Sequence, residues 1–575
     1  MAAFALPGVF VVAGTASHVG DFDAATRLAC GLGLRTCSSL APLSSLFSYA
    51  FSWMPLGSLG FRIAIGHGLL AAVASAVLFR AMLALVRALG MREHELSVPL
   101  CLGLTLLCVG LSPVWTVAMA GGNQALVISL CVLVLNIIQH VSFMHVEEQT
   151  GLAARWIGLL SLLICFVAWE EPYCAGVLLI SAVLSLRHVA RCARFPLLLG
   201  AVLGLAPGAL VVERISVPGA QPVPWLWGID RATFAIGHAL VEPELDVIVL
   251  VALLGGLVVL RSVAFAIWPW LVVGALSYAC SWLTASSGAA TSLWMALALC
   301  ASAVLICAPL SMLLRGQTER PSSVSLLFGV ALCTLGFLQL QHRSKDAMER
   351  TVFDAGLFME DALSELPPEA ILLTTTVQTQ VLATQAAIEA GSRPDIAIAP
   401  LSDLSEVTRV NPIVETMPQL RSVAASLLFA GHLSLSELQT LAGQRPLFLE
   451  LASSEIEPLH EAVRPAQWFY ELLPGGTSRE DVSIAAEQRA NWYQALLASL
   501  DLESASPALV AFLRAKQRID ALDAMTMGAR EAAQTSIDFG LQLSPADAEF
   551  DAMRTYLADH AQDKELDISP WVSTP

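Results

Sequence analysis

Charged residues are scarce in this chain, and their scarcity excludes most classes of soluble protein. Only 14% of the 575 residues are Asp, Glu, Lys or Arg, whereas 56% are hydrophobic. An ordinary globular domain contains about a quarter charged residues. Lysine is absent before Lys345. A chain of this composition has too much apolar surface to be soluble throughout, so a large part of it is expected to lie in a membrane.

The few charges are divided unevenly along the sequence. Residues 1–340 contain 14 acidic and 15 basic residues, whereas residues 341–575 contain 34 and 16, which gives the second segment a net charge of −18. The first segment is therefore expected to be an apolar membrane domain and the second an acidic, water-soluble part. An acidic surface repels phosphate, so nucleic acid is not expected as a partner.

Cysteine is missing from the water-soluble part, because all 12 cysteines precede residue 340. Most of them lie in apolar runs, where cysteine acts as a small apolar side chain. Cys30 and Cys37 share one predicted loop, and a disulfide between them is an open alternative. The sequence contains no metal-site spacing of Cys and His, no glycine-rich phosphate loop and no nucleophile elbow. Neither a metal nor a bound cofactor is expected.

Eleven apolar segments are read as membrane spans, several of them short. They are residues 3–16, 61–86, 98–118, 124–145, 156–169, 172–186, 196–212, 247–261, 263–283, 291–314 and 323–340. The arginines after the second, sixth and tenth spans are separated by even numbers of spans, so they share one side. The positive-inside rule makes that side the cytoplasm. The N-terminus is then cytoplasmic, and loops 17–60 and 213–246 and the tail lie outside, in the periplasm of a bacterial inner membrane.

Residues 156–186 could form one long helix instead of two short ones. One helix would be longer than a bilayer core of about 30 Å and would place Glu170 and Glu171 at its middle. Two buried carboxylates there would be costly. Dividing the segment at Glu170-Glu171-Pro172 places both carboxylates at the outer face. It also keeps the three arginine-containing loops on the same side of the membrane.

The tail is expected to contain an α/β domain over residues 341–478 and a helical segment over 479–575. Strands are predicted at 370–376, 396–399 and 446–451, with a helix at 378–391, and this alternation favours a small parallel or mixed sheet. Residues 529–560 resemble a tetratricopeptide-like half repeat, although a plain helical cap explains them equally well.

The first outer loop contains the residues best placed for chemistry. Asp21 and Asp23 directly follow a span, where a carboxylate could act as a general base on an acceptor hydroxyl. Arg27 and Arg35 could hold a lipid phosphate, since guanidinium pairs well with phosphate oxygens. The alternative is that the two acids only mark a helix end at the water interface.

A second outer loop contains aromatic and basic residues. Trp225 and Trp227 could stack on a sugar, or they could anchor the loop at the interface. Arg231 is a candidate ligand for a donor phosphate. Within the spans, His67, Asn136 and Gln139 are expected to hydrogen-bond to neighbouring helices.

Several short motifs occur in a recognisable order. They are Asp21, Leu32-Gly33-Leu34, Pro55-Leu56-Gly57 with Arg62, Trp115, 224–233 (PWLWGIDRAT), 366–372 (LPPEAIL), Arg393-Pro394-Asp395-Ile396 and Arg445-Pro446-Leu447-Phe448. In this order and spacing, residues 15–475 resemble the protein O-mannosyltransferase-like membrane family, whose members have a GT-C type glycosyltransferase fold. The resemblance implies a polyprenyl-phosphate-sugar donor, transfer at the outer face and Asp21 as the base.

Three polar positions of that family are replaced in this sequence. The usual Glu is Ala24, the His-Pro-Pro-Gly segment is 36–39 (TCSS), and the His-containing turn after the fifth span is Glu170-Glu171. Glu170 and Glu171 are therefore candidate substrate-binding residues. The sequence favours a GT-C-like transferase acting on a protein or glycan acceptor. The alternatives are a catalytically inactive relative that serves as a scaffold in a membrane complex, and a flippase or other transporter.

Overall fold

The structure is a computed structural model. It describes residues 1–14, 42–54, 59–89, 94–119, 123–146, 150–186, 194–215, 243–283, 288–315, 323–350, 359, 362–375, 379, 383, 393, 395–405, 410, 413–415, 417–450, 462–476, 478–499, 507–545, 547–560, 566, 568 and 571. These residues are mostly helical and fall into two compact units, of which the first ends at Glu349 and the second begins at Arg350.

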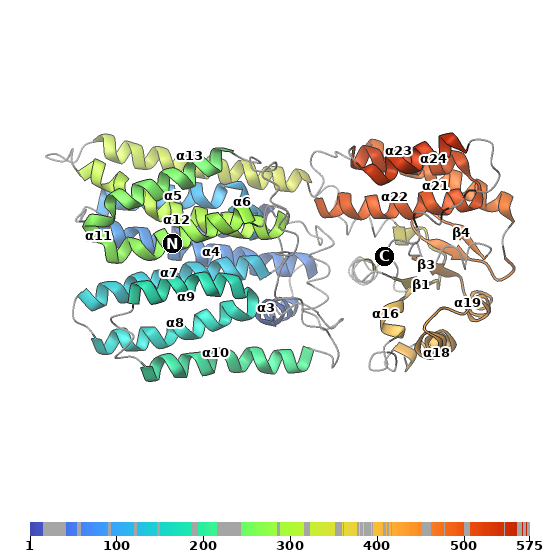
Figure 1. The fold of residues 1–575 in the computed structure, drawn as a ribbon, viewed down its shortest axis with the longest axis horizontal. Helices are drawn as coiled ribbons and strands as arrows, with labels where there is room; N and C mark the ends of the chain where they lie inside the picture. The colour runs from blue at the N-terminus through green and yellow to red at the C-terminus, as the bar shows by residue number, and fades with distance from the viewer. Residues whose placement is uncertain are drawn as a thin grey trace. The chain divides into compact units, whose positions relative to one another are not determined.

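The first unit consists of helices (Figure 1). They are α1 (Ala2–Gly14), α3 (Pro42–Ser52), α4 (Leu59–Ala88), α5 (His94–Gly110), α6 (Ser112–Met119), α7 (Asn123–Val146), α8 (Thr150–Glu170), α9 (Pro172–Leu186), α10 (Arg194–Ile215), α11 (Pro243–Leu283), α12 (Gly288–Arg315) and α13 (Ser323–Arg350). Among the described residues, four helical stretches are long and apolar enough to cross a membrane: Ile65–Ala88, Gln124–Phe143, Ala153–Glu170 and Leu293–Leu314. Five further helical stretches are apolar but shorter.

Helix α11 folds back on itself near its middle. A Cβ added at Gly274 would lie 3.5 Å from the Leu253 side chain, and one added at Gly256 would lie 3.3 Å from Leu271. In a straight helix these pairs would be about 31 Å and 22 Å apart, at 1.5 Å per residue. The chain therefore reverses between Leu260 and Ala266. The two halves correspond to the segments 247–261 and 263–283 of the sequence analysis.

The chain also reverses between α8 and α9. Helix α8 ends at Glu170, and α9 begins at Pro172, which has no N–H to continue the hydrogen-bond ladder. Helix α9 packs along α7 and α11 rather than extending beyond α8. The predicted division at Glu170-Glu171-Pro172 is present, and both carboxylates lie at the reversal.

A chain of contacts through Gln139 aligns four helices. Gln139 Nε2 of α7 donates to the Ala81 carbonyl of α4 at 3.1 Å, and Trp270 Nε1 of α11 donates to Gln139 Oε1 at 2.8 Å. One residue before Trp270, the Pro269 carbonyl accepts from Ser181 Oγ of α9 at 3.3 Å. The expectation that Gln139 hydrogen-bonds to neighbouring helices is confirmed.

These contacts place the ends of several helices together. Ala81 lies seven residues before the end of α4, and Ser181 lies five before the end of α9. The Cys101 and Cys307 sulfurs, 4.0 Å apart, bring the start of α5 to the end of α12. We call this the arginine end, because loops 89–93, 187–193 and 316–322 leave from it. The shared end agrees with the prediction that these three loops lie on one side. That this side is the cytoplasm stays a prediction.

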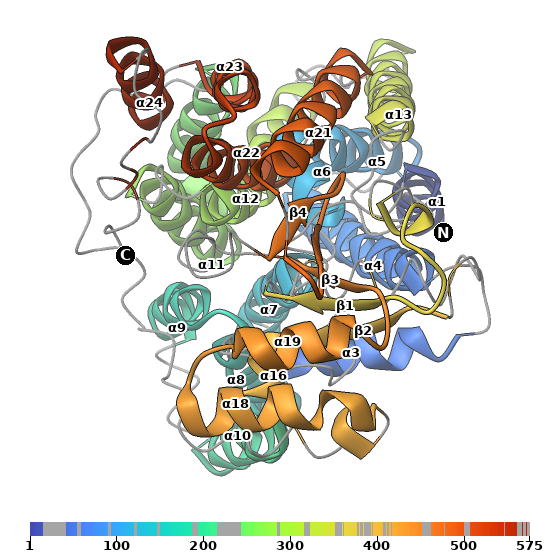
Figure 2. The ribbon, with the colours of Figure 1, turned by 90° about the vertical axis from the view of Figure 1, so that its right-hand side faces the viewer.

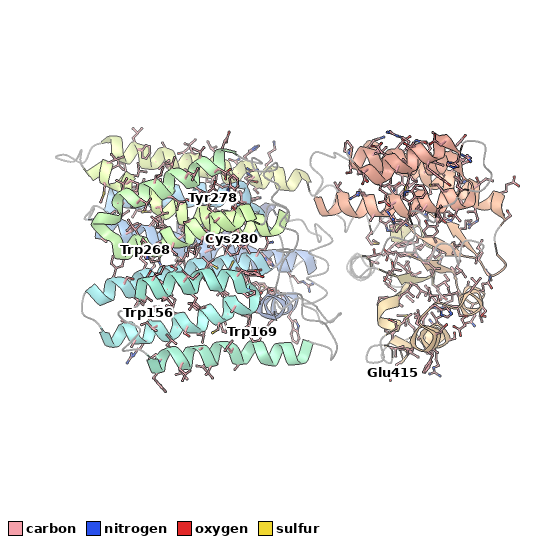
Figure 3. All side chains as sticks on the ribbon, viewed as in Figure 1. Trp156, Trp169, Trp268, Tyr278, Cys280 and Glu415 are labelled. Atoms are coloured by element: carbon pink, nitrogen blue, oxygen red, sulfur yellow. The ribbon has the colours of Figure 1, made fainter. Side chains whose placement is uncertain are left out.

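The opposite end of the unit carries α3, and we call it the α3 end. Figure 3 shows Trp156 and Trp268 toward the arginine end, and Trp169 and Cys280 toward the α3 end. Helix α13 runs parallel to α5, because Cys333 Sγ contacts the Pro99 carbonyl and Gln339 Nε2 contacts the Gly110 carbonyl, at 3.2 Å and 3.0 Å. The last helix of this unit therefore runs toward the α3 end.

Glycines allow the helices to approach closely. Two of them, Gly200 and Gly204, lie four residues apart on α10 and face Gly158 and Cys165 of α8. A Cβ at Gly200 would lie 2.0 Å from the Gly158 carbonyl oxygen, so only glycine fits there. Without water to drive apolar surfaces together, packing of backbones at small residues holds such helices.

The second unit is built on a five-stranded mixed sheet. The strands are β1 (Ile371–Thr374), β2 (Ala397–Pro400), β3 (Leu447–Leu449), β4 (Val463–Pro465) and β5 (Tyr470–Leu472), in the order β2-β1-β3-β5-β4. Strand β1 pairs in parallel with β2 and β3, and β5 pairs antiparallel with β3 and β4. The three predicted strands are confirmed, and β4 and β5 are additions.

Helices cover the sheet on both sides (Figure 2). On one side lie α16 (Leu401–Leu404), the short helix Pro418–Leu420, α18 (Arg421–Ala430) and α19 (Leu435–Ala442), and on the other α21 (Arg479–Ser499), α22 (Pro507–Met527), α23 (Arg530–Leu543) and α24 (Ala548–Asp559). Gly540 of α23 lies against the Phe550 ring of α24, so the predicted helix–turn–helix is present. The helices after Arg479 belong to the same unit as the sheet.

We expect Gly200→Ala to separate α8 from α10, because the added methyl group would overlap the Gly158 carbonyl oxygen. The cost should be about 1–3 kcal/mol, as for other overpacked contacts. The apparent thermal unfolding midpoint of the full chain in detergent would report it. The matched control is Gly176→Ala in α9, where a Cβ meets nothing within 4 Å. Equal midpoints for both variants would contradict this account of the α8–α10 contact.

Candidate functional site at the α3 end

Most residues predicted to form the site lie outside the described residues. They are Asp21, Asp23, Arg27, Arg35, Trp225, Trp227 and Arg231. The same is true of Cys30 and Cys37. The structure describes Glu170 and Glu171, and it shows that these two adjacent carboxylates have different surroundings.

Glu170 binds the N-terminus of α3. Its Oε1 accepts the backbone N–H groups of Leu43 at 2.6 Å and Ser44 at 3.1 Å, and the residue is only 5% exposed. Helix α3 begins at Pro42, so these are two of the amides that no carbonyl of the helix itself can satisfy. A carboxylate at this position also faces the positive end of the helix dipole. Glu170 thus fixes the start of α3 to the end of α8.

Helix α3 lies across the ends of the other helices. Helix α3 appears end-on in Figure 1 and lengthwise in Figure 2. Its neighbours α8 and α10 appear lengthwise in Figure 1 and end-on in Figure 2. Helix α3 packs against α4, α7, α8 and α10. The sequence predicts a loop over residues 17–60. Helix α3 has only 11 residues, several of them serines, so it is too short to be read as a span.

Aromatic side chains of α3 pack against α4. Phe47 and Phe51 lie so close to Gly66 that a Cβ there would be within 3.0 Å of both rings. The Phe47 ring also meets the buried His67 ring edge-on, with 6.4 Å between centroids. The lack of a side chain at Gly66 therefore allows α3 to lie on the bundle, and His67 contributes to this packing.

Glu171 occupies the single residue between α8 and α9. Its backbone closes one helix and opens the next. Its N–H donates to the Val167 carbonyl of α8 at 2.7 Å, and its carbonyl accepts from the Ala175 N–H of α9 at 3.1 Å. The side chain is partly buried and makes no hydrogen bond or ion pair with the described residues. Of the two adjacent acids, Glu170 is thus the one that holds α3.

In the second unit, motif residues gather at the amino ends of the parallel strands. Asp395 accepts from Arg393 at 3.0 Å and from the Glu369 backbone N–H at 2.9 Å, and Glu369 pairs with Arg445 at 3.2 Å. The Arg393 guanidinium holds the pKa of Asp395 below its ordinary value. Arg393 also donates to the Leu366 and Pro367 carbonyls. These contacts connect the segments that precede β1, β2 and β3. The motif residues therefore have a structural role.

The carboxyl ends of the same strands carry polar groups. Glu450, directly after β3, accepts from the Thr375 backbone N–H at 2.9 Å and from Thr379 Oγ1 at 2.7 Å. The strand order reverses direction between β1 and β3, and ligands of open α/β sheets bind at the carboxyl ends near such a point. Here Glu450 instead bridges two threonines of the segment after β1.

The helical unit contains a small pocket. Its volume is about 30 Å³, and it lies between α4, α5, α6, α7 and α12. The Ser75 and Ser129 hydroxyls on its wall donate to backbone carbonyls of their own helices, so the lining is apolar. The space is sufficient for about one water molecule. No three acidic, histidine or cysteine side chains of the described residues come together as a metal site.

In comparisons with known proteins, no protein-family model and no curated protein matches this chain.

We expect Glu170→Ala to release the N-terminus of α3, because two buried amides lose their acceptor. The cost should be about 0.5–2 kcal/mol, as for other helix caps. Hydrogen exchange of the backbone amides of residues 42–52 in the detergent-solubilised chain should accelerate. Glu170→Gln, which keeps a carbonyl oxygen, should show a smaller effect. Glu171→Gln is the matched control and should leave exchange in α3 unchanged. Unaltered protection in Glu170→Ala would rule out the cap as the anchor of α3.

Proposed function

We propose that this protein is a membrane glycosyltransferase of GT-C type with eleven spans. It would transfer a sugar from a polyprenyl phosphate (or pyrophosphate) donor to a protein or glycan acceptor at the outer face of a bacterial inner membrane. The support for this proposal is the ordered set of motifs between residues 15 and 475, which resembles the protein O-mannosyltransferase-like family. The gathering of three arginine-containing loops at one end supports the proposed topology.

Asp21 is the proposed general base, with Asp23 as a possible helper. In this step the carboxylate takes the proton of an acceptor hydroxyl. The acceptor oxygen forms a bond to the anomeric carbon, and the bond from that carbon to the phosphate oxygen breaks. The lipid phosphate leaves with the bonding electron pair, and Arg27, Arg35 or Arg231 would hold its charge. Trp225 and Trp227 would stack on the sugar.

The observation that best supports the assignment of the site is the cap formed by Glu170. Residues 15–41, which contain Asp21, join the end of α1 to the start of α3. Contacts of Gly8 with Ala72 and of Val12 with Gly68 fix the end of α1 near the start of α4. Glu170 fixes the start of α3 at the same end. The two helices that flank the segment with the proposed base are thus fixed at one end of the helical unit.

A scaffold role in a membrane complex is the second candidate function. The replaced family positions favour it, and so does the commitment of Glu170 to α3. Through its Oε1, this carboxylate serves the packing of the bundle, a structural role that does not require chemistry. A membrane fold can lose its chemistry and still serve as a binding subunit.

Asp21→Asn is the decisive variant for the transferase proposal. It should lower sugar transfer by about a hundredfold or more, because a general base contributes at least that factor. The measurement is transfer of radiolabelled sugar from a polyprenyl-phosphate donor in membranes that contain the full chain. The control is Glu244→Gln, which neutralises an exposed acid in the first turn of α11 at the same end.

Three outcomes separate the two functions. Loss of transfer in Asp21→Asn alone would support the transferase with Asp21 as the base. Full transfer in Asp21→Asn would refute the assignment of the base. Absence of transfer in the unmodified chain, together with stable co-purification of a membrane partner, would support the scaffold.

A further inference from the structure

The interface between the sheet and helices α21 and α22 contains a dense group of buried charges. Helix α22 carries Lys516, Asp520 and Asp523 at positions i, i+4 and i+7, which lie on one face of a helix. Arg489 projects from α21 toward the same face. Each of these four residues is at most 6% exposed. Charges this deeply buried are costly unless each has an opposite charge and hydrogen bonds.

Asp520 is the best-paired carboxylate of the cluster, although its partners all lie at Oδ1 and its Oδ2 makes no hydrogen bond. Its Oδ1 accepts from Arg489 Nη1 at 2.7 Å and from the Tyr470 hydroxyl of β5 at 2.8 Å, and Lys516 Nζ lies 3.5 Å away. Although burial acts to raise its pKa, Lys516 and Arg489 hold the pKa of Asp520 below its ordinary value. Asp520 therefore stays ionised.

Arg489 is also fully engaged. Besides Asp520, its guanidinium donates to the Ala466 and Phe469 carbonyls of the turn between β4 and β5. It also lies over the Tyr470 ring, 4.1 Å from the centroid. Arg489 thus joins α21, α22 and the β4–β5 turn, and it has little capacity for a second carboxylate.

Asp523 lies in the same cluster without an ion pair. It is 2% exposed, its Oδ1 makes no hydrogen bond, and the Tyr470 side chain, which also serves Asp520, is its one hydrogen-bonding neighbour among the described residues. The charged and titratable groups around it are Arg489 and Tyr493 of α21, Tyr470 of β5, Lys516 and Asp520 of α22, and Glu450 after β3, which faces Lys516. Helix α23 contributes apolar side chains, such as Ala533 and Ile537, to its contact with α22.

Charge balance decides the protonation state of Asp523. With Asp523 neutral, two cations, Arg489 and Lys516, face two anions, Asp520 and Glu450. With Asp523 ionised, the buried cluster has one uncompensated negative charge, placed one helical turn from Asp520. Consistent with this, burial raises the pKa of Asp523 to about 7. A carboxyl group with this pKa changes charge near neutral pH.

We propose that this cluster is a proton-dependent switch in the packing of the second unit. With a proton on Asp523, the cluster is balanced and holds α21 and α22 against β5 and the β4–β5 turn. Loss of that proton brings two like charges together and loosens both helices. The ambient pH would thus set how firmly this face of the unit is ordered.

The direction of the pH effect follows from linkage. A carboxyl group whose pKa is raised on folding binds more protons in the folded state, so its stabilising contribution falls as pH rises through the folded value. In the opened state Asp523 is ionised at any pH above about 5. Between pH 6 and pH 8, the equilibrium constant for opening of α21 and α22 should therefore rise about tenfold.

Hydrogen exchange of the full chain in detergent measures this opening. Exchange of residues 507–527, corrected for the intrinsic pH dependence of amides, should be about tenfold faster at pH 8 than at pH 6. Asp523→Asn and Asp523→Leu, which are neutral at every pH, should remove the difference. Glu487→Gln, which alters an exposed acid of α21, is the matched control and should retain it.

The outcomes decide the proposal in either direction. A difference of less than about twofold in the unmodified chain would overturn it, and this measurement does not depend on whether any variant folds. A tenfold response that persists in both Asp523→Asn and Asp523→Leu would also overturn it, because another group would then be titrating. Loss of the response in either variant, with its retention in Glu487→Gln, would support the switch at Asp523.

Discussion

The reversal of the chain at Glu170-Glu171-Pro172 is the constraint on which the helical unit depends. A carboxylate pair is costly at the centre of an apolar bundle, so the chain turns there and both acids lie at an end. The same turn reverses the direction of α9 and hence of every helix after it. It also places Glu170 where its carboxylate can hold the N-terminus of α3. The direction of the helices after α8 and the fixed position of α3 thus have the same cause.

Both units satisfy many of their buried polar groups internally, but with different kinds of group. In the helical unit, serine hydroxyls return to backbone carbonyls, and Gln139 links α4 to α11 through neutral hydrogen bonds. In the second unit, full charges do this work, as in the contacts of Arg489 with Asp520 and two carbonyls. Neutral groups suit a core in which every uncompensated charge is expensive, whereas buried ions require balance by opposite charges.

The sequence predicted those features that depend on local patterns. Apolar runs located the long helices, and the alternation around Leu372 and Phe448 located the parallel strands. It missed α3, because eleven residues with several serines lack the signal of a span. It missed the charge cluster, because Lys516, Asp520 and Asp523 at helical spacing are typical of a solvated face. Only the distant Arg489 and Tyr470 make that face a buried one, and no local pattern contains this information.

The fold-back of α11 has a consequence for how such a chain is built. Its two halves are joined by almost no intervening sequence, so in the proposed topology they would enter the bilayer as one hairpin. Arg261, at the reversal, would then stay on the side of synthesis. In that topology, gain or loss of the whole hairpin would change the number of crossings by two, and every later segment would keep its compartment. An ancestral chain could therefore have acquired this element without inverting the rest of the molecule.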